Sequence, residues 1–210
     1  MKPKKRNKEL NFLKRKLLHA TPYLNLYETF DHFYYAERKG VDSIAALCFK
    51  VDKNGTTKFY VHYQVMPQII QKQHEFDMYA CPITGSMEVG ENSLACAIRE
   101  VYEEGGIQVG VEHLRAMTKA LATTQMNEQV HHFLFDVSEL KVTRPKTDGS
   151  YFEQFAENKW LTQEQLEKLI FESSNVKLSS LLICYLMWCN VKQGKYNIQL
   201  FPPKPKNKQY

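Results

Sequence analysis

Three glutamates near the middle of the chain, Glu100, Glu103 and Glu104, have the spacing of a cation-binding cluster. On a helix they fall within an arc of about 100°, so their carboxylates project from one side. Carboxylates held this close repel one another unless a cation neutralises them. Oxygen ligands favour Mg²⁺ or Mn²⁺, and these ions usually complete their coordination with water and substrate phosphates. The cluster therefore predicts metal-dependent chemistry on a phosphate compound.

A helix over residues 93–104 is predicted to position this cluster. Its apolar stripe is offset from the carboxylates, so one side can pack while the other faces a cleft; the stripe consists of Leu94, Ala97, Ile98 and Val101. Asn92 or Ser93 can cap the start, and Gly105-Gly106 can end the helix. Arg99 lies four residues before Glu103 and can orient it through a salt bridge.

The residues around the cluster complete a longer motif. Gly85 is followed after five residues by Glu91, and after seven more by Arg99-Glu100-Val101-x-Glu103-Glu104-x-Gly106-Ile107. This pattern resembles the Nudix box, G-x5-E-x7-R-E-U-x-E-E-x-G-U with U aliphatic, at every defined position. A chance match in a chain of this length has odds of roughly 10⁻⁸. A solvated acidic helix face would explain an isolated E-x-x-E-E, but not the other matched positions.

The resemblance implies an enzyme that hydrolyses a nucleoside diphosphate linked to another moiety, with Mg²⁺ or Mn²⁺ as cofactor. It also implies an α/β fold, a Nudix-type α/β/α sandwich with a mixed central sheet, which agrees with the interleaved strands and helices of the sequence. By analogy, the metal ligands would be Glu100, Glu104, Glu103 and the carbonyl of Thr84, with Glu103 alternatively the base. Arg99 would support catalysis, and the structural positions of the motif would be Gly85, Glu91 and Gly106.

The resemblance extends over about residues 40–165 and is closest to the ADP-ribose pyrophosphatase-like subgroup. Tyr60-Val61-His62-Tyr63-Gln64 resembles the V-x-Q-Y-R segment of that group, and Met126-Asn127-Glu128 resembles its acidic loop before a strand. Gln64 and Glu128 would thus bind substrate. Glu153, with Glu157, resembles the late acidic loop that supplies the general base in that group.

The chain departs from the subgroup at several positions. Met66 stands where the group has an arginine that contacts phosphate, Cys81 replaces a glutamate, and a proline expected after the box is absent. The best candidate substrate is ADP-ribose, cleaved to AMP and ribose 5-phosphate, and other nucleoside diphosphate derivatives stay open. Two alternatives are an RNA-directed cap hydrolase that docks through the basic N-terminus and a non-enzymatic regulator that binds a nucleotide.

Four parts are predicted along the chain: a basic arm (1–16), a β segment that could mediate homodimerisation (17–40), the Nudix domain (41–200) and a Pro/Lys-rich tail (201–210). The remaining elements are predicted from hydrophobic periodicity and turn signals. The strands are placed at one or two positions in 23–38 and at 44–51, 58–65, 78–83, 115–122 and 130–137. The further helices are placed at 162–171 and 178–192.

Composition and charge exclude several classes of protein. The 210 residues are 43% hydrophobic and 24% charged, which is typical of a soluble globular protein, and no apolar run approaches the roughly 18–20 residues of a membrane span. Five cysteines without a C-x-x-C pair indicate reduced thiols and a cytoplasmic location. The arm carries a net charge of +7 and the rest of the chain −2. We interpret the arm as a solvated terminus, with nucleic-acid docking as the alternative.

Overall fold

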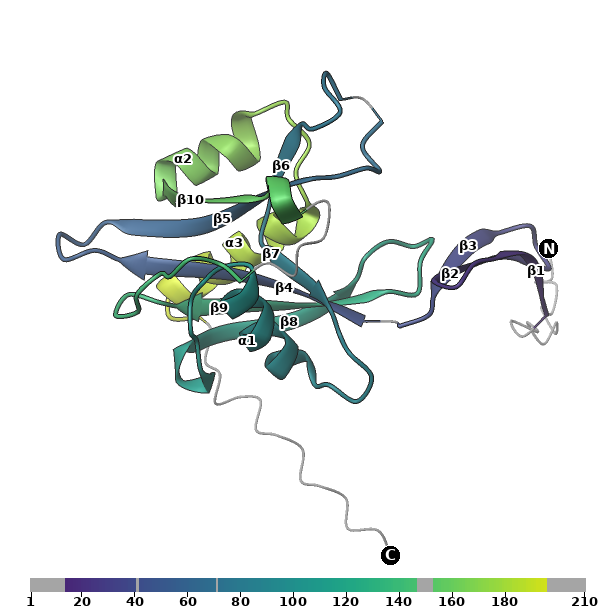
Figure 1. The fold of residues 1–210 in the computed structure, drawn as a ribbon, viewed down its shortest axis with the longest axis horizontal. Coiled ribbons are helices and arrows are strands. Elements are labelled where there is room, and N and C mark those ends of the chain that lie inside the picture. Colours follow the sequence, from purple (N-terminus) through teal and green to yellow (C-terminus); the bar gives the residue numbers. More distant parts are fainter. Residues whose placement is uncertain (1–13, 41, 71, 147–152, 196–210) are drawn as a thin grey trace, which may run out of the picture.

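The computed structural model describes residues 14–40, 42–70, 72–146 and 153–195 (Figure 1). The tail over 201–210 and nearly all of the basic arm lie outside these ranges. The last two residues of the predicted arm, Arg15 and Lys16, already belong to a strand, β1.

A seven-stranded mixed sheet forms the centre of the protein. Its main path runs β10-β5-β4-β9-β8, with β6 paired to β5 and β7 paired to β4. The β4–β9 pair is parallel and the other pairs are antiparallel. The strand bounds are β4 Asp42–Val51, β5 Thr57–Val65, β6 Met78–Cys81, β7 Ile83–Ser86, β8 Leu114–Leu121, β9 Gln129–Asp136 and β10 Glu157–Thr162.

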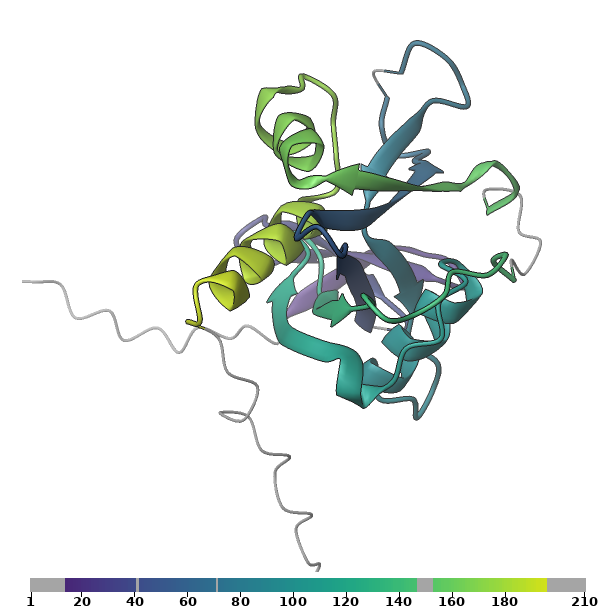
Figure 2. The same ribbon diagram turned by 90° about the vertical axis from the view of Figure 1, so that its left-hand side faces the viewer.

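Helices cover both faces of this sheet, as Figure 2 shows, and confirm the predicted α/β/α arrangement. Alternate residues of β4 divide the core: Ile44, Ala46 and Cys48 pack on the α1 side, whereas Leu47 and Phe49 pack on the α3 side. The helical elements are α1 Ser93–Glu103, η1 Val111–His113, η2 Glu153–Phe155, α2 Gln163–Glu167, the π-helical turn η3 Lys168–Glu172 and α3 Ser179–Lys192. Among the described residues, no helix has the length and apolar content needed to cross a bilayer.

Local sequence signals place several of these elements well. Asn92 caps α1 by accepting from the Ala95 amide, and Gly55 turns the β4–β5 hairpin with a positive φ of 82°. The predicted capping box at the start of α2 is confirmed, with Thr162 and Gln165 bonded reciprocally. The predicted strand over 78–83 is wrong in one respect, because it is two strands separated at Pro82. Proline lacks the amide hydrogen that a continuous ladder requires.

The Pro82 break changes the shape of the sheet. On one side of it β6 pairs with β5, and on the other β7 pairs with β4. The ends of β4 and β5 therefore take different partners, and a cavity opens between them. The prediction also missed β10, which pairs with β5 and was interpreted as loop.

A separate three-stranded sheet projects from the body at the N-terminal end (Figure 1). Its strands are β1 Arg15–Ala20, β2 Leu24–Thr29 and β3 Tyr34–Arg38. Two of them match the prediction for residues 23–38, and β1 was missed because its residues are all exposed and show no buried face. The sheet touches the body through β3, where the Ala36 amide donates to the Gln125 carbonyl and the Arg38 amide donates to Asn127.

Candidate active site

Arg99 is the centre of the acidic cluster. Its Nε and Nη2 donate to the two carboxylate oxygens of Glu91 at 3.1 and 3.0 Å, a bidentate pair. Its Nη1 donates to Glu100 at 2.7 Å and to Glu103 at 3.0 Å. The predicted Arg99–Glu103 pair is therefore present, as part of a larger network. Hydrogen bonding to Arg99 lowers the pKa of Glu91 to about 2, so Glu91 stays ionised and fixes the guanidinium.

Steric contacts explain why the motif has glycine at positions 85 and 106. A methyl group on Gly85 would overlap the carboxyl group of Glu100, so any larger residue on β7 would force that carboxyl group to move. Gly106 adopts a positive φ of 66°, and a methyl group there would overlap the carbonyl of Thr143. The structure thus brings the loop and helix halves of the motif into direct contact.

A cavity of about 380 Å³ contains the carboxylates of α1. Glu100 is buried, the Glu104 side chain is 12% exposed and the Glu103 side chain is 43% exposed, so Glu103 reaches furthest toward solvent. The residues that line the cavity are Thr84, Gly85, Ser86, Glu88, Arg99, Glu100, Glu103, Glu104 and Lys146.

The donor chemistry of this cavity fits a divalent cation. All acidic donors in it are carboxylate oxygens, the ligand type of Mg²⁺ and Mn²⁺. Within the described residues, no three His, Cys, Asp or Glu side chains already stand at metal-ligand spacing. Arg99 supplies the positive charge that holds Glu100 and Glu103 together here. Coordination of an ion would therefore require these carboxylates to turn toward it.

A buried histidine, His62, lies next to the carboxylate of Glu104, and no sequence motif singled it out. His62 on β5 is only 2% exposed. Its Nδ1 lies 2.8 Å from Asn158 Oδ1, and its Nε2 lies 3.9 Å from Glu104 Oε2. Asn158 Nδ2 in turn donates to the Glu104 carbonyl at 2.7 Å. Burial lowers the pKa of His62, so the ring is held neutral.

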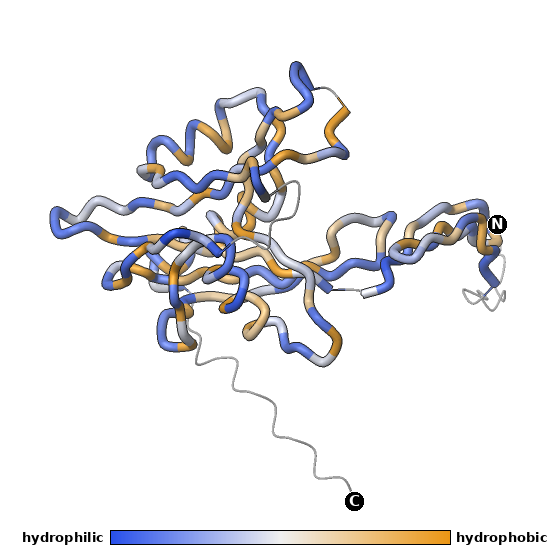
Figure 3. Tube along the Cα trace, in the orientation of Figure 1, coloured by the Kyte–Doolittle hydropathy of each residue, from blue (hydrophilic) through white to orange (hydrophobic). Residues whose placement is uncertain are grey.

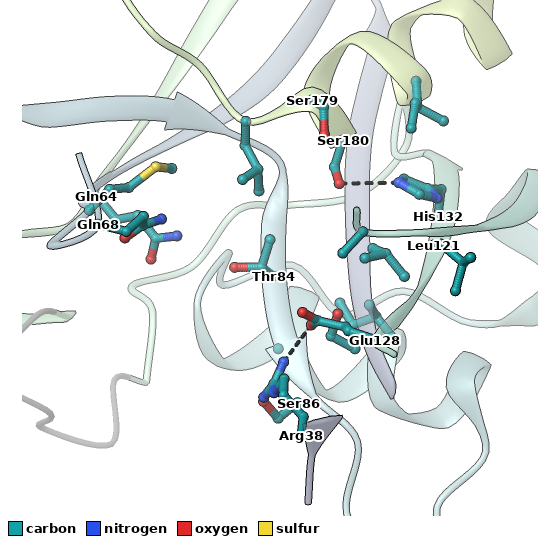
Figure 4. Close-up of a pocket in the computed structure, with 18 residues that line it drawn as sticks. Arg38, Gln64, Gln68, Thr84, Ser86, Leu121, Glu128, His132, Ser179 and Ser180 are labelled. Carbon is teal, nitrogen blue, oxygen red and sulfur yellow. Dashed lines mark hydrogen bonds and ion pairs between the residues drawn. The ribbon is translucent and has the colours of Figure 1, made fainter. Parts of the chain in front are cut away.

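A second cavity, of about 450 Å³, also borders β7 (Figure 4). Gln64 and Gln68 lie at one end, Arg38 and Glu128 form an ion pair at another, and Thr84 lies between them. Thr84, Gly85 and Ser86 line both cavities, so β7 is their shared wall. The predicted substrate residues Gln64 and Glu128 therefore come together in one cavity beside the acidic cluster.

Glu153 and Glu157 were both predicted to lie in a late acidic loop, and the structure places them in a helix and a strand. Glu153 begins the short helix η2, and its side chain lies outside what the structure describes. The loop assignment for Glu157 is wrong, because this residue opens β10 opposite Tyr63 and its carboxylate pairs with Lys159. Four of the six residues of β10 are charged or polar, and its two apolar residues are adjacent, so the sequence shows no strand alternation there.

His132, which lines the second cavity, is expected to make stability depend on pH. Its Nε2 lies 3.1 Å from Ser180 Oγ, and burial together with the neighbouring His131 lowers its pKa to about 4. Between about pH 6.5 and pH 4 the unfolded chain binds a proton that the folded chain does not. The free energy of unfolding should therefore fall as pH drops through this window, by on the order of 2 kcal/mol.

The comparison of wild type with His132→Gln isolates this contribution, because glutamine can keep a bond to Ser180 but does not titrate. Urea unfolding at about pH 7 and about pH 5 should show a smaller loss of stability in the variant. Equal losses in both proteins would mean that His132 does not carry the effect.

The fold and the site together define a class of protein: a mixed sheet between helices, in which the glycine of a short strand packs directly against a carboxylate-bearing helix. The NUDIX domain family model matches residues 44–182. The chain therefore belongs to the Nudix family and is a Nudix hydrolase, the class of enzyme that hydrolyses nucleoside diphosphate derivatives, generally with divalent cations such as Mg²⁺. No curated protein matches the chain.

Proposed function

We propose that this Nudix hydrolase cleaves ADP-ribose to AMP and ribose 5-phosphate with Mg²⁺ or Mn²⁺. The observation that carries the proposal is the shared wall formed by β7. A diphosphate lying across Thr84, Gly85 and Ser86 would contact the acidic cavity, while its organic part could occupy the cavity that contains Gln64 and Glu128.

In this proposal, different side chains of the acidic cavity bind the cation, accept the proton and orient the base. Glu100, Glu104 and the Thr84 carbonyl would hold the cation, which when bound supplies positive charge to the diphosphate oxygens. Glu103 is the most exposed of the three glutamates and would accept a proton from the attacking water, with Glu153 the second candidate for this role. Arg99, fixed by Glu91, keeps Glu103 oriented.

The second cavity offers a replacement for the missing phosphate-binding arginine. Met66, at that sequence position, is buried and lines the cavity without a charge. Arg38 reaches the same cavity from β3 and pairs there with Glu128. A guanidinium at this place can contact a phosphate or ribose oxygen bidentately. We therefore assign the phosphate contact to Arg38.

The experiment that tests this function is AMP release from ADP-ribose with Mg²⁺ or Mn²⁺, beside 8-oxo-dGTP, a dinucleoside polyphosphate and capped RNA. The expected result is rapid AMP release from ADP-ribose and no turnover of the other three compounds. Turnover of another compound instead would keep the Nudix chemistry and overturn the substrate. Binding without turnover of any of the four would favour a regulator that only binds nucleotide.

We also propose that the N-terminal sheet mediates a cytoplasmic homodimer. Figure 3 shows hydrophobic segments along this projecting sheet. The exposed large side chains of this region include Leu17, Leu18 and Tyr23. Exposed apolar surface of this kind marks interaction sites. Sedimentation velocity should show a dimer that Leu17→Glu weakens. Val111→Glu, at an even more exposed apolar site on the body, should leave the dimer unchanged, and a monomeric wild type would contradict the proposal.

A further inference from the structure

The hydrogen bonds around His62 fix which of its nitrogens carries a hydrogen. Asn158 donates through Nδ2 to the Glu104 carbonyl, so its Oδ1 is the atom that faces the imidazole. Oδ1 can only accept, and Nδ1 of His62 must therefore be the donor. In the neutral ring this leaves a lone pair on Nε2. β5, β10 and the end of α1 meet at this point, and the two residues are register partners.

The lone pair on Nε2 faces a carboxylate. Among the described residues Nε2 makes no hydrogen bond, and it lies 3.9 Å from Glu104 Oε2. This distance is too long for a hydrogen bond, which needs about 2.7–3.2 Å. Two electron-rich atoms that are both buried repel each other in a medium of low dielectric constant.

A divalent ion would turn this repulsion into coordination. Ligands each about 2.1 Å from one ion are separated by about 3.0 Å when cis and about 4.2 Å when trans. The distance of 3.9 Å between Nε2 and Oε2 is nearer to the trans separation than to the cis one. The oxygen of Asn158 accepts from the far nitrogen of the ring, and a metal-binding histidine likewise donates its other N–H to an oxygen acceptor that fixes the tautomer and the ring orientation.

We infer that His62 is a nitrogen ligand for a divalent cation bound with Glu104, and that Asn158 positions it. The inference rests on the proposed function, since it assigns Glu104 to the metal site. It also predicts which ions the site prefers. Imidazole nitrogen suits Zn²⁺ and Ni²⁺, whereas Mg²⁺ and Mn²⁺ prefer oxygen ligands. The chain should therefore bind Zn²⁺ more tightly than Mg²⁺, and Mn²⁺ serves as the paramagnetic probe of the same site.

Electron spin echo spectroscopy of the full chain loaded with Mn²⁺ tests this directly, because a bound imidazole gives a ¹⁴N coupling to the ion. The coupling should be present in wild type and in His74→Gln, which alters an exposed histidine of a loop. It should be absent in His62→Gln. Asn158→Ala should lower Mn²⁺ affinity by about 10–100-fold, as the loss of a supporting partner typically does.

A wild-type spectrum without the coupling rejects the histidine ligand whether or not the variants fold, and a coupling in wild type is assigned to His62 by its loss in His62→Gln. Mn²⁺ bound with an affinity that Glu104→Gln abolishes, but without a ¹⁴N coupling, would overturn the histidine ligand and leave the proposed function standing. Failure of Mn²⁺ and Mg²⁺ to bind at all would overturn both. A coupling that persists in a folded His62→Gln variant would assign the nitrogen to another residue and also reject the inference.

Discussion

Glu104→Gln should reduce turnover of the substrate by about 10³-fold while the protein stays folded. Glu104 is the C-cap residue of α1, and its side chain lines the acidic cavity. Glutamine has nearly the same shape but no negative charge, so the cavity would lose a cation ligand. Metal stabilisation of a developing charge contributes several kcal/mol, and each 1.36 kcal/mol corresponds to a factor of ten.

Steady-state hydrolysis and metal titration by calorimetry would measure this effect, with thermal unfolding as the check on folding. Glu112→Gln is the matched control, because the Glu112 side chain is 74% exposed and lies outside both cavities. It should keep wild-type activity within about twofold, as surface substitutions usually do. If Glu104→Gln retained activity and metal affinity, Glu104 could not be a ligand.

The helix and its motif could be predicted because their information is local. The 3.6-residue period and the Asn92 cap lie within a dozen residues, and the Gly85 contact follows from a motif of fixed spacing. The strands β1 and β10 carry no comparable signal. One is wholly exposed and the other is an edge strand with mostly polar side chains, so neither alternates between apolar and polar residues.

The contact between His62 and Asn158 could not be predicted from the sequence, because it depends on pairing between distant segments. His62 and Asn158 are separated by 96 positions and meet only through the register of β5 with β10. In isolation, a histidine within Tyr60–Tyr63 is typical of an ordinary strand residue. Arg99 shows the same limit: its contact with Glu103 followed from helical spacing, but its bidentate pair with Glu91 requires the folded loop before α1.

Gly85→Ala should lower turnover by about 100-fold or more with little loss of stability. The added methyl group would overlap the buried carboxyl group of Glu100, which Arg99 holds in place. The backbone of Gly85 has no positive φ, so alanine can adopt its conformation and the protein should fold. The Glu100 carboxylate would have to move instead, and a displacement of about 1 Å at a reacting centre can cost roughly 10²-fold in rate.

Gly110→Ala provides a matched comparison for this steric argument. A methyl group on Gly110 would also overlap a glutamate carboxylate, that of Glu112, and Gly110 has an extended backbone with a φ of −129°. Glu112 is mostly exposed and can swing into solvent, whereas Glu100 is confined between β7, α1 and Arg99. Kinetic assays should therefore show near wild-type turnover for Gly110→Ala and a large loss for Gly85→Ala. Equal turnover in the two variants would show that the position of the Glu100 carboxylate does not limit the reaction.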